Sequence, residues 1–518
     1  MAMELSALPM LLLLLLPLLC VFLCLRWDTS WKQSRADGLK AYPIVGTLPH
    51  FVKNQHRLIE WSAGVLARCP TYTMSFNFRG LGLAAGVMTA NPANVEHVAR
   101  TNFQNYPKGE FVVSVIEDLL GHGIFNSDGD QWLSQRKAAS YEFSKRSMRN
   151  FVVRTVRFEI VERLLPLLSR AERDGRTLDV QHVLELFAFD NISRVVFDED
   201  PACLTEEGMA VNGCAAFMRA LSDAQSIVMA RFMSPVKWAW RVQKLLDMEP
   251  ERRMRDAVAT IHGYVDRVVR ERSERGASGL ARKDDFLSRF ASSGELSDES
   301  LRDVVTNFIV AGRDTTSSAL TWFFWILSGR PDAEDKIVRE IRAVRASSSG
   351  IIADAAVLGY EELREMQYLH AAISESMRLY PPVAMDTHCS LREDTLPDGT
   401  FVGEGWQVTY SAYAMARLEE IWGPDCEEFR PERWLDEEGV FRPVSMFKYT
   451  VFHAGPRMCL GKELAYIQMK SIVACVLERF SFRLVGDQKK KPGLVFSLTL
   501  RMEGGLHMQV KKRGALNR

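Results

Sequence analysis

The sequence predicts a mainly α-helical protein with a minor β part, built as one large domain behind an N-terminal transmembrane helix. Three observations support this fold class: an uncharged apolar run opens the chain, long amphipathic stretches fill its middle, and short alternating segments resemble strands. The 518 residues suffice for a large buried core. We expect a membrane anchor over residues 1–30 and a single domain over residues 31–518.

The apolar run covers residues 5–25, consists mostly of leucine, and has about the length that crosses a bilayer as a helix. Arg26, Lys32 and Arg35 follow it, whereas Glu4 alone carries charge before it. The positive-inside rule therefore places the remainder of a single-pass protein in the cytosol. A cleaved secretory signal is the alternative, but its apolar part spans only about 7 to 15 residues behind a basic start.

Charge and cysteine content exclude several classes of protein. Lys and Arg number 65, as do Asp and Glu, so no overall positive field points to nucleic acid. The nine cysteines show no C-x-x-C pair and no regular spacing, which predicts neither a disulfide framework nor a structural zinc site. A reducing, cytosol-facing compartment fits this cysteine pattern.

Local patterns predict the remaining elements. Proline and glycine within residues 42–46 predict a change of direction between anchor and domain. Alternating and turn-forming residues predict strands over 72–78 and 82–88, and a C-terminal hairpin whose strands, 494–502 and 506–511, flank Glu503-Gly504-Gly505. Amphipathic periodicity predicts helices over 154–170, 254–272 and 333–345.

A longer helix is predicted over residues 298–328, capped by Ser297 and followed by Gly329. The hexapeptide Ala311-Gly312-Arg313-Asp314-Thr315-Thr316 interrupts its apolar middle. Hydroxyls that bond one turn back bend helices, so we expect a local opening here. Asp314 beside Thr315 offers a route for protons, as general acid chemistry requires. Alternatively, the threonines only satisfy themselves within a buried helix.

The most specific segment runs from Phe452 to Gly461, in the order FHAGPRMCLG. Gly455 and Gly461 permit close approach to a flat ligand, and Arg457 supplies a fixed charge for a carboxylate. The residues after Cys459 predict a helix over 462–477, whose N-terminus would lower the pKa of the Cys459 thiol. A thiolate at this position is suited to ligate iron.

Two further motifs pair charged or aromatic side chains on one helical face. Glu375 and Arg378 stand three residues apart, and Arg433 follows in Phe429-Arg430-Pro431-Glu432-Arg433-Trp434. Trp132 and Arg136 stand four residues apart and can both donate to a carboxylate. Taken alone, each pair is common in packing and weak as a signal.

The F-x-x-G-x-R-x-C-x-G pattern resembles the signature loop of the cytochrome P450 superfamily, and all five fixed residues are present. The resemblance implies a helical P450-type fold, with Cys459 ligating the iron of haem. It makes Asp314 and Thr315 the catalytic, oxygen-activating pair, and Glu375, Arg378 and Arg433 a buried triad that braces the cysteine loop. The implied haem contacts are Phe452, Gly455, Arg457, Gly461, Trp132, Arg136 and His388, the last standing where many relatives have arginine.

Four segments are similar to one branch of this family, the plant fatty-acid ω-hydroxylases and their jasmonoyl-isoleucine-oxidising relatives. They cover residues 42–50, 187–192, 197–201 and 453–459. The branch implies terminal hydroxylation of a fatty acid with O2, with jasmonoyl-isoleucine as the nearest alternative substrate. Ala311 replaces a glutamate that attaches haem covalently in related animal enzymes, so haem b should be held by the thiolate alone. The implied pocket is apolar, as a lipid-like substrate requires; its residues are Phe111, Val112, Val304, Phe308, Val383, Ala384, Met385 and Leu498.

No dinucleotide loop or flavin domain follows the cysteine motif, so electrons must come from NADPH through a separate cytochrome reductase. With the anchor, this places the enzyme in the endoplasmic reticulum membrane. Two other classes share the iron ligand: a thiolate-haem isomerase or dehydratase, and a haem sensor without turnover. Asp314 and Thr315 argue against both, because neither class needs proton delivery to oxygen.

Overall fold

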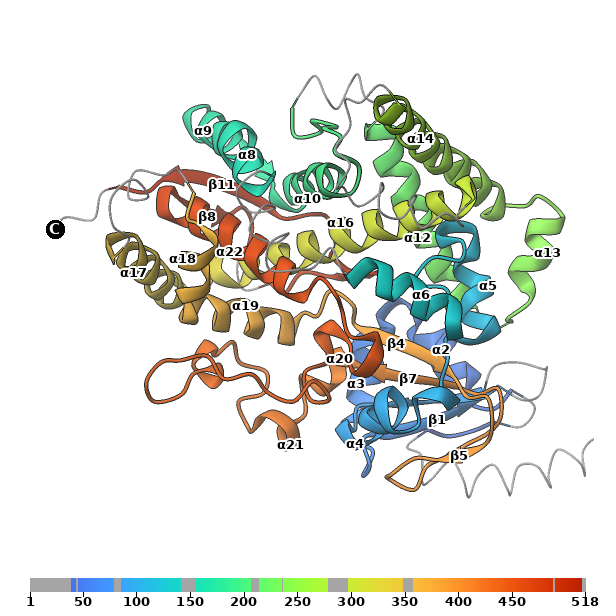
Figure 1. Cartoon of the computed structure of the whole chain (residues 1–518). Coiled ribbons are helices and arrows are strands. Elements are labelled where there is room, and N and C mark those ends of the chain that lie inside the picture. The colour runs from blue at the N-terminus through green and yellow to red at the C-terminus, as the bar shows by residue number, and fades with distance from the viewer. Residues whose placement is uncertain are drawn as a thin grey trace, which may run out of the picture.

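The protein is mainly helical with a minor β part, which confirms the predicted fold class (Figure 1). The computed structural model describes residues 39–42, 45–78, 85–140, 155–205, 214–234, 236–277, 297–347, 357–487 and 490–514. The predicted anchor over residues 1–30 lies outside this set. Within the set, no helix has both the length and the apolar character that a bilayer crossing needs.

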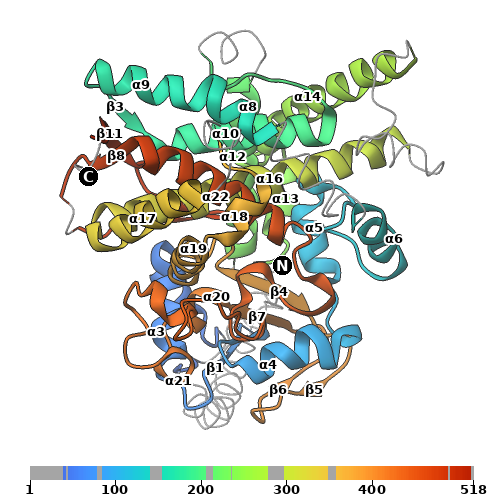
Figure 2. The ribbon, with the colours of Figure 1, turned by 60° about the vertical axis from the view of Figure 1, so that its left-hand side comes forward.

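The helices gather around α16 (Asp298–Ser328), which runs through the middle of the helical part in both views (Figures 1 and 2). α16 contacts α5, α10, α14, α19 and α22. The other α-helices are α2 (Leu48–Asn54), α3 (Leu58–Leu66), α4 (Pro92–Glu96), α5 (Gly109–Leu120), α6 (Gly129–Ser140), α8 (Arg157–Glu159), α9 (Leu165–Arg173), α10 (Val180–Phe197), α12 (Cys214–Met233), α13 (Ala239–Leu245), α14 (Glu251–Ala277), α17 (Pro331–Ser347), α18 (Tyr360–Glu365), α19 (Gln367–Leu379), α20 (Ala412–Met415), α21 (Glu419–Trp422) and α22 (Lys462–Arg479).

The bounds of α16 are those that the sequence predicts. Ser297 caps it by accepting a hydrogen bond from the Ser300 amide at 3.2 Å, and Gly329 follows its last residue. The helix continues through residues 311–316, and Thr315 makes the expected hydrogen bond one turn back, to the Ala311 carbonyl. Gly312 serves packing: a Cβ there would lie 2.6 Å from the Ile192 side chain of α10. The glycine lets two buried helices approach closely.

Most other predicted helices are also present. The stretches 254–272 and 333–345 lie inside α14 and α17. The stretch predicted over 154–170 divides into α8, a π-helical turn over Ile160–Leu164, and α9, with residue 154 outside the described set. The helix predicted after Cys459 is α22, which begins at Lys462. Amphipathic periodicity thus located the helices but not the π-turn.

The main sheet has the strand order β1-β2-β7-β4 and forms the part of the molecule beneath the helices in Figure 1. β1 (Thr73–Asn77) and β2 (Ala85–Thr89) confirm the two predicted N-terminal strands and pair antiparallel, with Thr73 opposite Thr89. β7 (Gln407–Ser411) is parallel to β2 and antiparallel to β4 (Met385–Cys389). Tyr42 and Gly46 exchange two backbone hydrogen bonds of 2.8 Å, which produces the predicted change of direction before the sheet.

The C-terminal hairpin differs from its prediction. The pair is β9 (Leu494–Phe496) with β10 (Leu500–Met502), so the turn falls at residues 497–499 inside the stretch predicted as one strand. β11 (His507–Lys512) pairs instead with β8 (Phe480–Leu484) and β3 (Thr177–Asp179). β5 (Asp394–Thr395) and β6 (Phe401–Val402) form a separate pair. Contacts with α16 determine where the chain turns, because the Leu500 carbonyl accepts hydrogen bonds from the side chains of Ser318 and Trp322.

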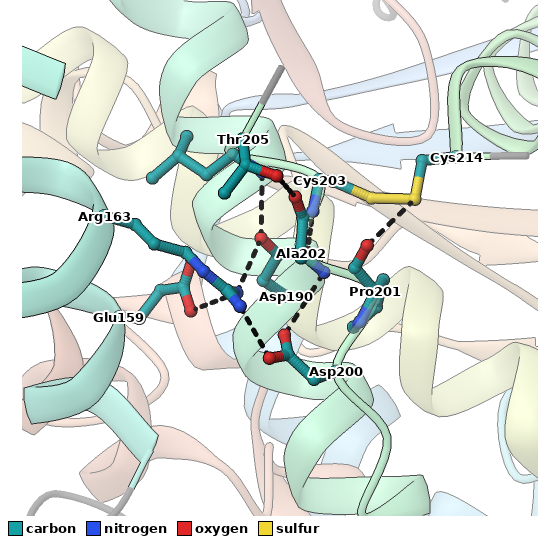
Figure 3. Close-up of a disulfide and its surroundings, with 10 residues drawn as sticks. Glu159, Arg163, Asp190, Asp200, Pro201, Ala202, Cys203, Thr205 and Cys214 are labelled. Atoms are coloured by element: carbon teal, nitrogen blue, oxygen red, sulfur yellow. Dashed lines mark hydrogen bonds and ion pairs between the residues drawn. A yellow bond between two sulfur atoms is a disulfide. The ribbon is translucent and has the colours of Figure 1, made fainter. Parts of the chain in front are cut away.

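One disulfide joins Cys203 to Cys214, at the start of α12 (Figure 3). The sequence expectation of reduced cysteines is therefore wrong for this pair, whereas Cys69, Cys389, Cys426, Cys459 and Cys475 are free. The Asp190 carboxylate accepts the backbone amides of Cys203 and Leu204 at 2.9 and 3.0 Å, which folds the chain after α10 back on itself. This turn, rather than sequence spacing, brings the two sulfurs together.

Candidate functional site

The cysteine loop between residues 452 and 461 has a shape that its backbone fixes. The Cys459 amide donates to the Phe452 carbonyl at 2.8 Å, which closes the loop. Gly455 has a φ of +64°, and a Cβ at this position would lie 1.9 Å from the Ala99 carbonyl oxygen. Only glycine fits both constraints. The loop therefore holds Cys459 in one place, just before the N-terminus of α22.

The surroundings of Cys459 act in opposite directions on its thiol. Burial raises the pKa of the Cys459 thiol and outweighs the Gly461 amide and the positive charges of Arg136 and Lys462, which favour the thiolate. The predicted lowering of this pKa is therefore wrong for the thiol itself. A metal ion that binds the sulfur would deprotonate it, because metal coordination deprotonates a thiol outright.

Three hydrogen-bond donors gather at the cysteine loop: Trp132 and Arg136 from α6, and Arg457 from the loop itself. The Arg136 guanidinium donates to the Met458 carbonyl at 2.6 Å. The Arg457 guanidinium lies over the Trp132 ring at 4.6 Å and donates to Asp128 at 2.5 Å. Burial lowers the pKa of both arginine side chains, which shows that their charges are held in a poorly solvated place.

One donor atom of this set is left without a partner among the described residues. The Nε of Arg457 is buried and makes no hydrogen bond, although its Nη2 donates to the Ser127 carbonyl and to Asp128. Unpaired buried donors are rare because each costs about 1–3 kcal/mol. A carboxylated planar group such as haem, with its propionates facing Trp132, Arg136 and Arg457, fits this donor set.

His388 belongs to a cluster on β4 and its neighbours. Its Nδ1 lies 2.9 Å from the Tyr106 carbonyl and its Nε2 lies 3.2 Å from the Asp386 carboxylate. Burial, and then the nearby Lys108 charge, lower the pKa of His388 and favour the neutral ring. Burial alone would raise the pKa of Asp386, but Lys108 and His388 hold it well below its ordinary value. His388 is thus oriented by a permanently charged carboxylate.

The predicted triad is assembled and buried. Arg378 of α19 donates to both Glu375 oxygens at 2.7 and 2.8 Å, and Arg433 donates to one of them at 3.1 Å. The Trp434 indole and the Arg430 amide add hydrogen bonds to the same carboxylate at 2.9 and 3.0 Å. Such complete pairing offsets the cost of burying these charges.

The acid and the alcohol of α16 lie in different surroundings. Thr315 Oγ1 donates to the Ala311 carbonyl at 2.7 Å, one turn back. Asp314 is buried, accepts from Gln225 of α12 at 2.6 Å and pairs with Arg313 at 2.8 Å. Arg313 in turn approaches Glu185 of α10, which pairs with Arg501 at 2.6 Å. A chain of polar groups therefore leads from the partly exposed Arg501 to the centre of α16.

A family model described as Cytochrome P450 matches residues 38–507. The chain belongs to the cytochrome P450 family. It is similar to Cytochrome P450 CYP94D108 of Paris polyphylla, with 45% identity over 90% of this chain and 91% of the relative. It is also similar to Cytochrome P450 94B1 of Arabidopsis thaliana, with 42% identity over 93% and 92%, and to Cytochrome P450 94A1 of Vicia sativa, with 40% identity over 92% and 90%.

Family membership makes the chain a haem-thiolate monooxygenase, an oxidoreductase that uses O2 and electrons from a reductase partner. It acts on a small-molecule substrate. The isomerase, dehydratase and sensor alternatives are thereby set aside.

The eight residues expected to line the P450 pocket come from elements that contact one another: α5, α16, the segment before β4, and the β9–β10 turn. The Leu500 amide donates to the Pro382 carbonyl at 2.8 Å, which ties that turn to the segment before β4. Val112, Val304 and Ala384 are buried. The other side chains are partly exposed, as expected of a wall that contacts ligand: Phe111, Phe308, Val383, Met385 and Leu498.

Sequence reasoning missed the carboxylates and amides that hold these P450 residues. Asp386 lies two positions before His388 in the same strand. Because side chains alternate between the two faces of a strand, this spacing could have indicated that the two lie on one face. Asp128 and Gln225, the partners of Arg457 and Asp314, come from other elements. Nothing in their sequence spacing indicates these contacts.

Proposed function

We propose that this P450 hydroxylates a medium-chain or long-chain fatty acid at or near its terminal carbon. The carrying observation is that the expected lining residues are apolar and that six of the eight (Phe111, Val304, Phe308, Ala384, Met385 and Leu498) belong to or pack against one hydrophobic cluster. Similarity to the plant ω-hydroxylase branch supports the same substrate class. A long alkyl chain can bind to this lining at little free-energy cost, because the expected lining residues are apolar and leave no polar side chain without a hydrogen-bond partner.

The proposal includes haem b held without a covalent bond to its ring. Cys459 would ligate its iron, and Trp132, Arg136, Arg457 and His388 would hold its propionates. Haem when bound supplies the oxidation that inserts one oxygen atom of O2 into a carbon–hydrogen bond. Phe452, Gly455 and Gly461 would contact its face.

Thr315 and Asp314 are the proposed proton carriers. The Thr315 hydroxyl hydrogen now lies toward the Ala311 carbonyl, and rotation about one side-chain bond turns it away from the helix. Gln225 and Arg313 hold the Asp314 carboxylate in place, and water would supply the proton that it passes on.

Electrons are proposed to come from NADPH through a cytochrome reductase. We also propose that residues 1–30 anchor the P450 in the endoplasmic reticulum membrane with its domain facing the cytosol. The basis is the apolar run over residues 5–25 and the basic residues that follow it. A membrane location suits the substrate, because long-chain fatty acids partition into lipid.

Terminal attack requires the protein to impose geometry, because a primary carbon–hydrogen bond is stronger than its secondary neighbours. Orientation then has to outweigh intrinsic reactivity. Jasmonoyl-isoleucine is the second candidate substrate, favoured by the same branch similarity.

The test supplies the reconstituted P450 and reductase with saturated fatty acids of graded length and, separately, with jasmonoyl-isoleucine. We expect oxygen at or next to the methyl end of the fatty acid. Oxidation of another lipid or a terpenoid, with neither class turned over, would overturn the substrate proposal.

A further inference from the structure

Lys237 lies in the short turn between α12 and α13, and its surroundings are unusual for a lysine. Its ammonium lies over the Phe111 ring at 4.7 Å, and Phe111 belongs to the expected pocket lining. Phe232, at the end of α12, packs edge-on against the same ring at 6.1 Å. The preceding Val236 packs against Phe76 and Phe78 of the sheet region. An aromatic wall therefore holds the cation in place.

Three basic side chains near Lys237 pair with carboxylates. Lys108 pairs with Asp386 at 2.5 Å, Lys244 pairs with Asp118 at 2.7 Å, and the buried Arg231 pairs with Asp118 and Glu251. Lys237 forms no ion pair with any carboxylate among the residues that the structure describes.

The nearest titratable group does not substitute for a carboxylate. Burial lowers the pKa of Lys237, and the Cys389 thiol is the other group that acts on it. Burial raises the pKa of that thiol, so Cys389 stays neutral near pH 7 and supplies no negative charge. A half-buried ammonium that lacks a counter-ion is costly, and a ligand carboxylate would offset this cost.

The position of Lys237 suits one end of an elongated ligand. The next residue, Trp238, is 56% exposed, whereas Val112 on the Phe111 side is 4% exposed. The ammonium thus lies at the boundary between the protein surface and the apolar wall of α5. α5 contacts α16, which carries Phe308, and Thr315 follows Phe308 two turns later in the same helix.

We propose that Lys237 binds the carboxylate of the substrate and so directs the opposite, apolar end toward Cys459 and Thr315. This inference rests on the proposed function and explains its terminal selectivity, because an anchored head group fixes which carbon reaches the reacting centre. It applies equally to jasmonoyl-isoleucine, which also carries a free carboxylate. Lys237 is accordingly a specificity-determining residue.

The test compares binding of dodecanoate and of its methyl ester by the shift in the haem absorption spectrum. In Lys237→Met the dissociation constant for dodecanoate should rise about tenfold, as expected for loss of a charged hydrogen bond. The methyl ester should bind with an unchanged constant, because it carries no charge. Lys237→Arg should keep most of the affinity for the acid, and the product of Lys237→Met should move from the terminal carbon into the chain.

Lys244→Met is the matched control, because it removes a lysine of α13 that already has Asp118 as its partner. It should leave dodecanoate binding unchanged. Equal effects of Lys237→Met on acid and ester would show a packing role and overturn the inference alone. A wild-type protein that binds neither dodecanoate nor jasmonoyl-isoleucine would overturn the proposed function, and the inference with it.

Discussion

The Glu375 cluster (Glu375, Arg378, Arg433 and Trp434) and the distal region (Thr315, Asp314 and Lys237) satisfy their polar groups differently. Glu375 accepts from two guanidinium groups, an indole and a backbone amide, and none of these partners can leave without exposing a buried charge. Thr315 is bonded only to its own helix, and Lys237 only to a ring. Saturated contacts fix structure, whereas exchangeable ones remain available to substrate and protons.

This contrast also explains how the P450 divides its functions. The Arg378 guanidinium donates to the carbonyls of Ala416, Cys426 and Glu428, which ties the segment before the cysteine loop to α19. That segment has no direct part in the chemistry. The distal region carries the proposed substrate and proton roles, and Gln225 of α12 links it to Asp314 of α16 at 2.6 Å.

Cys459→Ser should have the largest effect, since Cys459 is the proposed ligand of the iron. Serine is too weak an acid to replace a thiolate. We expect the reduced, carbon-monoxide-bound protein to lose the far-red Soret band of thiolate ligation, together with all hydroxylation. Cys475→Ser, which alters another buried thiol in α22, should retain the band. A variant of Cys459 that keeps the band would refute its role as iron ligand.

Glu375→Ala should produce the largest loss of stability. It leaves Arg378 buried without a carboxylate and Arg433 with Asp425 alone, which costs about 3–5 kcal/mol of unfolding free energy. Glu432→Ala is the control, because Glu432 is 40% exposed and pairs at 2.5 Å with the similarly exposed Lys336. Its cost should stay below about 1 kcal/mol. Urea unfolding followed by tryptophan fluorescence measures both, and equal costs would contradict the stabilising role of the buried Glu375 contacts.

The sequence predicts the cysteine loop and α16 better than the contacts between separate elements, and the reason is physical. The cysteine loop and α16 are contiguous, so their caps, glycines and spacings are visible in one stretch of chain. Contacts such as Gln225 to Asp314, or Lys237 to Phe111, join separate elements and depend on how these pack. The hairpin turn at residues 497–499 was missed for the same reason, because α16 determines it.

Thr315→Ala should have the smallest effect on structure and a selective effect on chemistry. The Thr315 hydroxyl donates only to the Ala311 carbonyl. Its removal leaves no polar group unpaired, because that carbonyl is already bonded within the helix. Haem and substrate binding should therefore survive. Product formed per O2 consumed should fall by at least about tenfold, because positioned proton donors contribute about 10²–10⁴ in rate.

Thr321→Ala provides the matched control for Thr315→Ala. Thr321 makes the same bond to the residue one turn back, Ser317, also at 2.7 Å, but lies nearly two turns further along α16. Its loss should change neither coupling nor binding. If both variants uncouple oxygen consumption equally, the effect belongs to helix packing and Thr315 has no role in proton transfer. If only Thr315→Ala does so, the exchangeable hydroxyl is a functional feature that distinguishes the distal region from the saturated Glu375 cluster.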